Sequence, residues 1–179
     1  MLFRSQVKIR AASGAGLFYG VQTFLQMVNE KKELPVGTVT DEPRFAYRGM
    51  MLDVSRHFFD VNFVKKHIDA FAYYKLNRLH LHLTDAAGWR IEIDKYPRLT
   101  EFAAWREFPT WKEWWNNGRQ YSEEGSENAY GGYYTKEDIR ELVAYAESRY
   151  ITVIPEIEMP AHSEEVLTAY PELSCTHEP

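Results

Sequence analysis

Acidic, basic and imidazole side chains gather directly after three short apolar segments of this sequence. They are Asp53, Ser55, Arg56 and His57 after the first segment, Asp85 after the second, and Glu156, Glu158 and His162 after the third. Carboxylates and imidazoles hold and transfer protons in catalysis, and a guanidinium offers a planar set of donors. Each residue alone has a structural interpretation, such as Asp53 capping a turn or Glu156 pairing with Arg56. Their gathering at three segment ends indicates an active site.

The three apolar segments are predicted to be strands of one parallel sheet. They cover residues 49–54, 78–84 and 151–155, and a helix is expected after each. Asp60 is a predicted N-cap, residues 135–138 resemble a capping box, and residues 163–169 are a candidate third helix. Strands that alternate with helices form parallel βα units with right-handed crossovers. The predicted fold class is α/β, with about the first three βα units of a partial (β/α)8 TIM barrel.

The middle strand alternates between apolar and polar residues. Leucines occupy positions 79, 81 and 83, whereas His80, His82 and Thr84 share the opposite face. A parallel strand covered on both faces is expected to be almost continuously apolar. A closed barrel accommodates the polar face, because inward side chains near the carboxyl ends of its strands approach the active site.

Two imidazoles on one strand face also fit a metal-dependent barrel hydrolase. His80 and His82 would be zinc ligands in that interpretation, and Asp85, Glu156 or His162 would complete the site. No other ligand spacing is distinctive. The single cysteine, Cys175, excludes an internal disulfide framework and a cysteine-rich zinc site.

The composition is that of a globular protein with an acidic balance. Of its 179 residues, 45% are hydrophobic and 26% are charged, and the formal net charge is -5. This charge argues against nucleic acid as a partner. No apolar run approaches the ~18 residues of a membrane span. Residues 1–43 alternate strand, helix and strand patterns and are predicted to be the C-terminal part of a small α+β domain, with the barrel in residues 44–179.

Four segments together resemble a known enzyme family. They are YRGMMLDVSRHFFDV (47–61), KLNRLHLHLTDAAGWRIEIDKYPRLT (75–100), GGYYTKEDI (131–139) and VIPEIEMPAH (153–162). These resemble the catalytic barrel of the family 20 glycoside hydrolases, the β-N-acetylhexosaminidases. AGLFYGVQTFLQM and TDEPRF resemble the end of the small α+β domain that precedes that barrel.

The resemblance implies removal of terminal, non-reducing β-linked N-acetylhexosamine by substrate-assisted, retaining hydrolysis. The partner would be a carbohydrate ending in N-acetylglucosamine or N-acetylgalactosamine, with no cofactor and no metal, in a periplasmic, extracellular or lysosomal location. The family's acid Glu and its Asp partner belong to a fourth strand. The only Asp-Glu dipeptide here, Asp41-Glu42, precedes the first barrel strand and is interpreted as a turn. We therefore expect this chain to be truncated before the catalytic pair and inactive alone, which keeps a noncatalytic fragment as an alternative.

Residue by residue, the resemblance assigns four roles. Arg56 matches the arginine that grips hydroxyls of the terminal sugar, and Asp85 and His162 match the residues that orient the acid. Glu158 stands where the family usually has Asp and is assigned a supporting role, with a side chain longer by one methylene. Further departures are Ala161 in place of Gly and the pair Ala86-Ala87 in place of more polar residues.

Residues 85–134 are too long for an ordinary βα connection of ~2–6 residues and are predicted to be a functional excursion. Residues 89–93 within it have the pattern of a short strand. Its aromatic residues are Trp105, Trp111, Trp114, Trp115 and Tyr121. They are expected either to line a sugar site or to pack the excursion onto the barrel.

Overall fold

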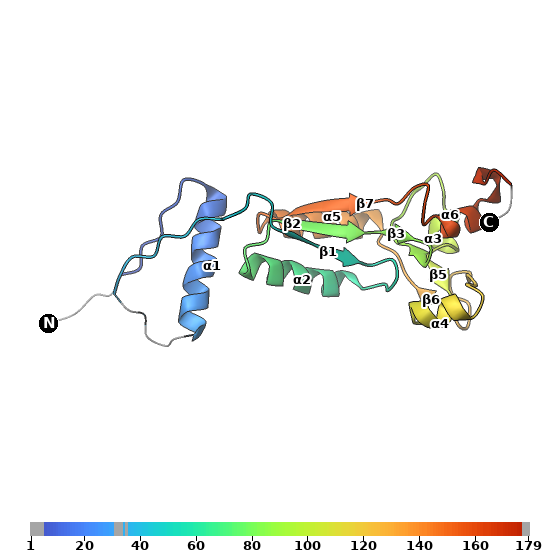
Figure 1. The fold of residues 1–179 in the computed structure, drawn as a ribbon, viewed down its shortest axis with the longest axis horizontal. Helices are drawn as coiled ribbons and strands as arrows, with labels where there is room; N and C mark the ends of the chain where they lie inside the picture. Colours follow the sequence, from blue (N-terminus) through green and yellow to red (C-terminus); the bar gives the residue numbers. More distant parts are fainter. Residues whose placement is uncertain (1–5, 31–33, 35, 177–179) are drawn as a thin grey trace.

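The computed structural model describes residues 6–30, 34 and 36–176. The molecule is elongated, with helix α1 (Gly14–Glu30) at one end, a parallel sheet in the middle and the long excursion at the other end (Figure 1). Within the described part of the chain, no helix is long and apolar enough to cross a membrane.

The central sheet has three parallel strands in the order β1-β2-β7. They are β1 (Gly49–Asp53), β2 (Arg78–His82) and β7 (Thr152–Glu156). The register aligns Asp53 with His82 and His82 with Glu156. The parallel arrangement of the three predicted strands is confirmed, and the register brings their polar carboxyl ends into one row.

Two capped helices pack beside the sheet (Figure 1). Helix α2 (Val61–Tyr73) begins after Asp60, whose side chain accepts the backbone N–H of Phe63, and α5 (Lys136–Glu147) begins with a full capping box at Thr135. Both predicted helix starts are confirmed. The core between helices and sheet is formed by fully buried aliphatic residues, among them Val64, Ile68, Leu79, Leu81, Leu83, Leu142 and Ala146.

The excursion is built from short elements. They are β3 (Thr84–Asp85), β4 (Gly88–Trp89), α3 (Arg98–Glu101), β5 (Trp105–Arg106), α4 (Trp111–Asn116) and β6 (Tyr130–Gly131). Strands β3 and β4 pair antiparallel, as do β5 and β6. After β7 come α6 (Glu164–Ala169) and the 3-10 helix η1 (Pro171–Leu173). Helix α6 matches the predicted third helix.

Four local strand predictions are wrong. The parallel strand predicted over 78–84 ends at His82, because Thr84 and Asp85 turn away to form a tight hairpin with β4. The strand predicted over 89–93 is reduced to β4 and a single bridge at Ile91. The two strands predicted on either side of the first helix do not form: residues 6–11 are irregular, and so are residues 34 and 36–39. Positions 1–5, 31–33 and 35 lie outside the described residues.

Candidate active site

Asp85 is the centre of the polar cluster. It is 3% exposed, and its Oδ2 lies 2.7 Å from Arg56 Nη2 and 3.0 Å from His82 Nε2. His162 Nδ1 lies 3.3 Å from its other oxygen, Oδ1. The hairpin β3-β4 holds Asp85 at this point, directly beyond the end of β2. One buried carboxylate thus joins an arginine and two histidines from three segments of the chain.

Arg56 is fixed by the turn that follows β1. Asp53 Oδ1 accepts the backbone N–H groups of Ser55 and Arg56, each at 3.0 Å, and its Oδ2 accepts Arg56 Nη1 at 2.8 Å. The side-chain acceptor closes the turn and orients the guanidinium at the same time. Arg56 is therefore clamped between Asp53 and Asp85, and its side chain remains 35% exposed on the pocket side.

The histidines of β2 point toward Glu156. Its Oε2 lies 2.6 Å from His82 Nδ1 and 2.8 Å from His80 Nε2. Burial lowers the pKa of His82, but hydrogen bonds to Glu156 and Asp85 outweigh it and hold that pKa above its ordinary value. The hydrogen bond with His82 lowers the pKa of Glu156, against the opposing effect of desolvation. His82 thus lies between the two carboxylates, and its contacts link the end of β2 to β7 through Glu156 and to β3 through Asp85.

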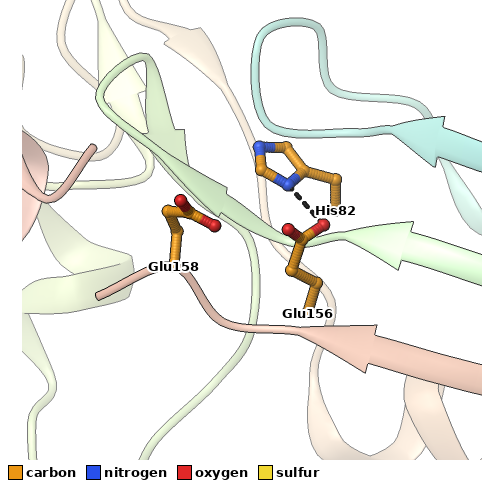
Figure 2. A group of neighbouring side chains, drawn as sticks. All are labelled: His82, Glu156 and Glu158. Atoms are coloured by element: carbon orange, nitrogen blue, oxygen red, sulfur yellow. Dashed lines mark hydrogen bonds and ion pairs between the residues drawn. The ribbon is translucent and has the colours of Figure 1, made fainter. Parts of the chain in front are cut away.

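Glu158 lies in the loop after β7 and points to the same region as Glu156 and His82 (Figure 2). Ligand atoms of His82, Glu156 and Glu158 lie within 4.8 Å of one another, which is the spacing of a candidate metal group. Both ring nitrogens of His82 already face carboxylates. A cation there would have to replace these contacts, so the donor set fits an internal ion-pair network better than a metal centre.

His162 sits in the loop that joins β7 to α6. Its backbone has φ +56°, a left-handed conformation that is uncommon for a residue with a side chain. The following Ser163 is buried, and its hydroxyl donates to the carbonyl oxygens of Glu158 and Ala161. This tight loop places the exposed imidazole against Asp85.

An open pocket of about 350 Å³ lies over these groups. Its lining residues are Arg56, Asp85, Ala86, Trp111, Trp115, Ala161, His162 and Glu164. Three of the four predicted site residues therefore share one cavity. Glu158 is the exception, because it lies beside Glu156 and His82 and not in the lining.

Sequence reasoning missed two buried arginines that connect the segments next to this pocket. Arg90 is fully buried and donates to the carbonyl oxygens of Ser55, Ala104 and Gly132, among others. Arg106, also buried, donates to carbonyls that include that of Arg56. A charged residue in a long insertion normally indicates solvent exposure, so the sequence carried no signal for these contacts.

Glu165 of α6 was missed as well. Its side chain is completely buried, and neither carboxylate oxygen has a hydrogen-bond partner among the described residues. Burial raises the pKa of Glu165 to about 8, with a further contribution from nearby Asp85. The residue is therefore a neutral acid over most of the acidic and neutral range.

Comparison with protein families gives two adjacent matches. Residues 45–179 match the family described as glycosyl hydrolase family 20, catalytic domain, and residues 2–42 match glycosyl hydrolase family 20, domain 2. The chain is 46% identical over 179 residues to a β-hexosaminidase of Porphyromonas gingivalis, which covers 94% of this chain and 21% of that protein. It is 42% identical over 174 residues to a β-hexosaminidase of Akkermansia muciniphila, and this match covers 94% of this chain and 32% of that protein. The chain thus spans between about a fifth and a third of these relatives.

Solved structures agree with the sequence matches. The family 20 exo-β-N-acetylglucosaminidase of Vibrio harveyi, in complex with N-acetylglucosamine, superposes with a TM-score of 0.75 at 41% identity, covering 91% of this chain and 25% of that one. A mutant Streptomyces plicatus β-hexosaminidase in complex with product, GlcNAc, gives 0.74 at 43% identity, covering 93% and 32%. The parallel βα units correspond to the start of the catalytic domain in this family. With most of its length matched by the catalytic-domain family and the preceding segment by domain 2, the chain belongs to glycosyl hydrolase family 20.

Proposed function

We propose that this chain contributes the sugar-gripping and acid-orienting part of a β-N-acetylhexosaminidase site. The observation that carries the proposal is the bonding of Asp85, which contacts both Arg56 and His162, and all three residues line one open pocket. A sugar needs charge-assisted hydrogen bonds to its hydroxyls, and a glycosidase needs a carboxylic acid of controlled orientation. In this proposal Arg56 supplies the hydrogen bonds to the hydroxyls, and Asp85 with His162 supports the carboxylic acid.

The proposed reaction is substrate-assisted hydrolysis of a terminal β-linked N-acetylhexosaminide. The 2-acetamido oxygen attacks the anomeric carbon as the bond to the leaving oxygen breaks, and a glutamic acid gives its proton to that oxygen. Water then adds to the anomeric carbon of the oxazolinium intermediate and loses a proton to the same glutamate. Two displacements restore the original β configuration. The glutamate and its Asp partner are those that the family resemblance assigns to a fourth barrel strand.

Within that reaction, four residues of this chain have roles, and Asp85 and His162 share one of them. Arg56 binds hydroxyls of the terminal sugar through its pocket-facing edge. Asp85 and His162 act as positioning residues, because the imidazole bonded to Asp85 can hold the acid glutamate in the correct orientation and protonation state. Glu158 supports the same region through its backbone N–H, which donates to Thr84 Oγ1 at 2.8 Å.

The test uses a chimaera in which residues 1–179 replace the matching segment of the Porphyromonas gingivalis β-hexosaminidase. Asp85→Asn keeps the shape of the side chain and removes its charge. It is expected to reduce kcat more than it raises KM and to shift the pH-rate profile of a chromogenic β-N-acetylglucosaminide. Asp85→Asn combined with His162→Ala should cost clearly less than the product of the single losses, since the two residues act as one unit.

Glu137→Gln is the matched control, because this carboxylate is exposed on α5, where it pairs with Arg140, and lies outside the pocket lining. It should leave both kinetic constants and the pH profile unchanged. Multiplicative losses for Asp85 and His162 with an unmoved pH profile would contradict the proposed unit. A parent chimaera that folds but hydrolyses no N-acetylhexosaminide would contradict the proposed function itself.

A further inference from the structure

Helix α4 separates three neighbouring tryptophans onto two faces. Trp111 and Trp115 are four residues apart and so lie on one face, whereas Trp114 lies on another. Trp114 is fully buried, its indole N–H donates to the carbonyl of Gln120 at 3.0 Å, and its ring meets Tyr121 edge-on. Trp114 therefore anchors α4 to the excursion.

The remaining aromatic residues of the excursion also have packing roles. Tyr121 donates from its hydroxyl to the carbonyl of Ala86, and the indole of Trp105 donates to the carbonyl of Thr100 at 2.8 Å. Packing thus explains Trp105, Trp114 and Tyr121. It does not explain Trp111 and Trp115, which are 41% and 48% exposed and line the pocket beside Arg56, Asp85 and His162.

The two exposed indoles form an ordered platform. Their ring centroids are 5.3 Å apart with an interplanar angle of 28°. Arg119 lies over the Trp115 ring at 5.0 Å, and its Nη1 pairs with Glu164 at 2.5 Å. Glu164 begins α6, two residues after His162. A cation–π contact and an ion pair therefore tie this platform to the loop that carries His162.

We propose that the Trp111–Trp115 platform binds the sugar on the leaving side of the cleaved bond, and so selects glycans over glycosides with small leaving groups. The inference deepens the proposed function and rests on it. The polar groups of the pocket, Arg56 above all, suit the hydroxyl-rich terminal sugar. His162 marks the side where the leaving oxygen is protonated, and the platform is tied to that side.

The chemistry of the platform agrees with such an occupant. The faces of a pyranose ring carry C–H groups, which pack against flat aromatic rings, and its edges carry hydroxyls. Because Trp111 and Arg119 both lie over the Trp115 ring, Trp111 offers the open face and Trp115 supports it. Two exposed indoles beside a small set of convergent polar groups form the kind of lining that a ligand site uses. Glu164 and Arg119 at the margin offer an acceptor and donors for the edge hydroxyls.

The experiment compares two substrates in the same chimaera. N,N′-diacetylchitobiose has a sugar as its leaving group, whereas methyl β-N-acetylglucosaminide has only methanol. Trp115→Ala and the double variant with Trp111→Ala are expected to lower kcat/KM for the disaccharide by about 10- to 100-fold. The kcat/KM for the methyl glycoside should change by less than about 2-fold, because its leaving group does not reach the platform. Phe at both positions should restore most of the disaccharide activity.

Tyr74→Ala is the matched control, because Tyr74 is a 70% exposed aromatic residue at the C-terminus of α2 and does not line the pocket. Tyr74→Ala should leave kcat/KM unchanged for both substrates. Equal losses on both substrates in the tryptophan variants would overturn the platform proposal and leave the proposed function standing. Unchanged kcat/KM on both substrates in the tryptophan variants would also overturn the platform proposal.

A parent chimaera inactive on both substrates would contradict the proposed function, and direct binding then decides the platform separately. The folded chimaera is labelled with 5-fluorotryptophan, and its fluorine NMR signals, assigned with single Trp→Phe variants, are followed during titration with the disaccharide. Shifts confined to Trp111 and Trp115, with Trp114 unmoved, are expected. Saturating disaccharide that moves neither signal would overturn the inference.

Discussion

At the scale of single residues, Arg56, the proposed sugar-binding group, is held in place by its neighbours without any substrate. Two carboxylates, Asp53 and Asp85, hold its guanidinium at 2.8 and 2.7 Å. The side chain of Arg56 has therefore already lost rotamer freedom in the folded protein. Binding a sugar would then cost less side-chain conformational entropy.

Arg56→Ala is expected to lower kcat/KM of the chimaera by roughly 10²- to 10⁴-fold, because two charge-assisted hydrogen bonds are worth about 1.5–3 kcal/mol each. Arg56→Lys should recover only part of this loss, since an ammonium cannot reproduce the planar fork. Steady-state kinetics on a chromogenic substrate provide the measurement. A loss below about 3-fold for Arg56→Ala would show that the arginine serves the protein network and not the sugar.

Glu165 gives a pH prediction with a definite sign. Burial raises its pKa from 4.5 to about 8, so between these values the unfolded chain releases a proton that the folded chain retains. Stability from this group is complete below pH 4.5 and falls as pH rises, until the folded carboxyl also ionises near pH 8. Glu165→Gln should therefore increase the free energy of unfolding at pH 8 by roughly 2–4 kcal/mol and have little effect near pH 4.5.

Chemical denaturation of the chimaera and its Glu165→Gln variant across this pH range provides the measurement. The neighbouring Glu164→Gln is the control, because that carboxylate is 46% exposed and pairs with Arg119 at the surface. A constant difference between parent and Glu165→Gln at every pH would show that Glu165 does not titrate with the fold.

At the scale of elements, the excursion is positioned by buried arginines and not by regular secondary structure. Its strands contain two residues each, so their ladders contribute few backbone hydrogen bonds. Arg90 compensates by collecting carbonyl oxygens from the turn after β1, from the stretch before β5 and from the strand region of β6. One side chain thus connects three segments of the chain, one of which leads directly into the pocket residue Arg56.

Arg90→Lys is expected to destabilise the chimaera by about 2–4 kcal/mol, because an ammonium has fewer donors and leaves buried carbonyl oxygens unpartnered. Arg140→Lys on the exposed face of α5 is the control and should change stability by less than about 0.5 kcal/mol. Denaturant unfolding and limited proteolysis within residues 105–130 provide the readouts. Equal stability of both variants would contradict the clamp described for Arg90.

At the scale of the whole molecule, the three-stranded sheet has a free edge on each side within the described residues. Among the residues that the structure describes, β1 and β7 each pair with β2 and with no other strand. Met50 and Met51 of β1 are 51% and 48% exposed. Unpaired backbone groups and exposed apolar side chains at a sheet edge favour association with other chains.

The isolated 179-residue chain is expected to hydrolyse no detectable chromogenic β-N-acetylglucosaminide and to self-associate. General acid catalysis is worth roughly 10²- to 10⁴-fold, and the described residues place no Asp-Glu pair in the pocket. Light scattering and a sensitive activity assay test both statements. Turnover near that of a complete family member, or a monodisperse monomer that melts cooperatively, would contradict the respective expectation.

The described part of the chain also clarifies the early Asp41-Glu42 dipeptide. Asp41 accepts from Thr23 Oγ1 at 2.8 Å and pairs with Lys75, whose hydrogen bond holds the pKa of Asp41 below its usual range. These contacts fasten the segment after α1 to Thr23 of α1 and to Lys75 beyond the end of α2, outside the pocket lining. No turn is assigned at residues 41–43, where the backbone is irregular, so the interpretation of Asp41-Glu42 as a turn is wrong. The division of the chain into residues 1–43 and 44–179 stays a prediction, as do the roles of Arg56, Asp85, Glu158 and His162.

The sequence alone determined the order of the parallel strands, the starts of α2 and α5, and the family. These features depend on local signals: the alternation of His80 and His82 with leucines, the side-chain caps at Asp60 and Thr135, and long contiguous motifs. Each signal lies within a few residues of the feature it specifies, so it can be interpreted without knowing what packs against it.

Only the tertiary structure decided which polar residues meet and which aromatic residues remain exposed. The contact of Asp85 with His162 spans 77 positions, and the one between Arg90 and Gly132 spans 42. Sequence patterns cannot distinguish Trp114, which is buried, from Trp115 beside it, because burial depends on what the loop packs against. Burial also made Glu165 a neutral acid and Arg90 a structural clamp, since desolvation is a property of the folded surroundings and not of the residue type.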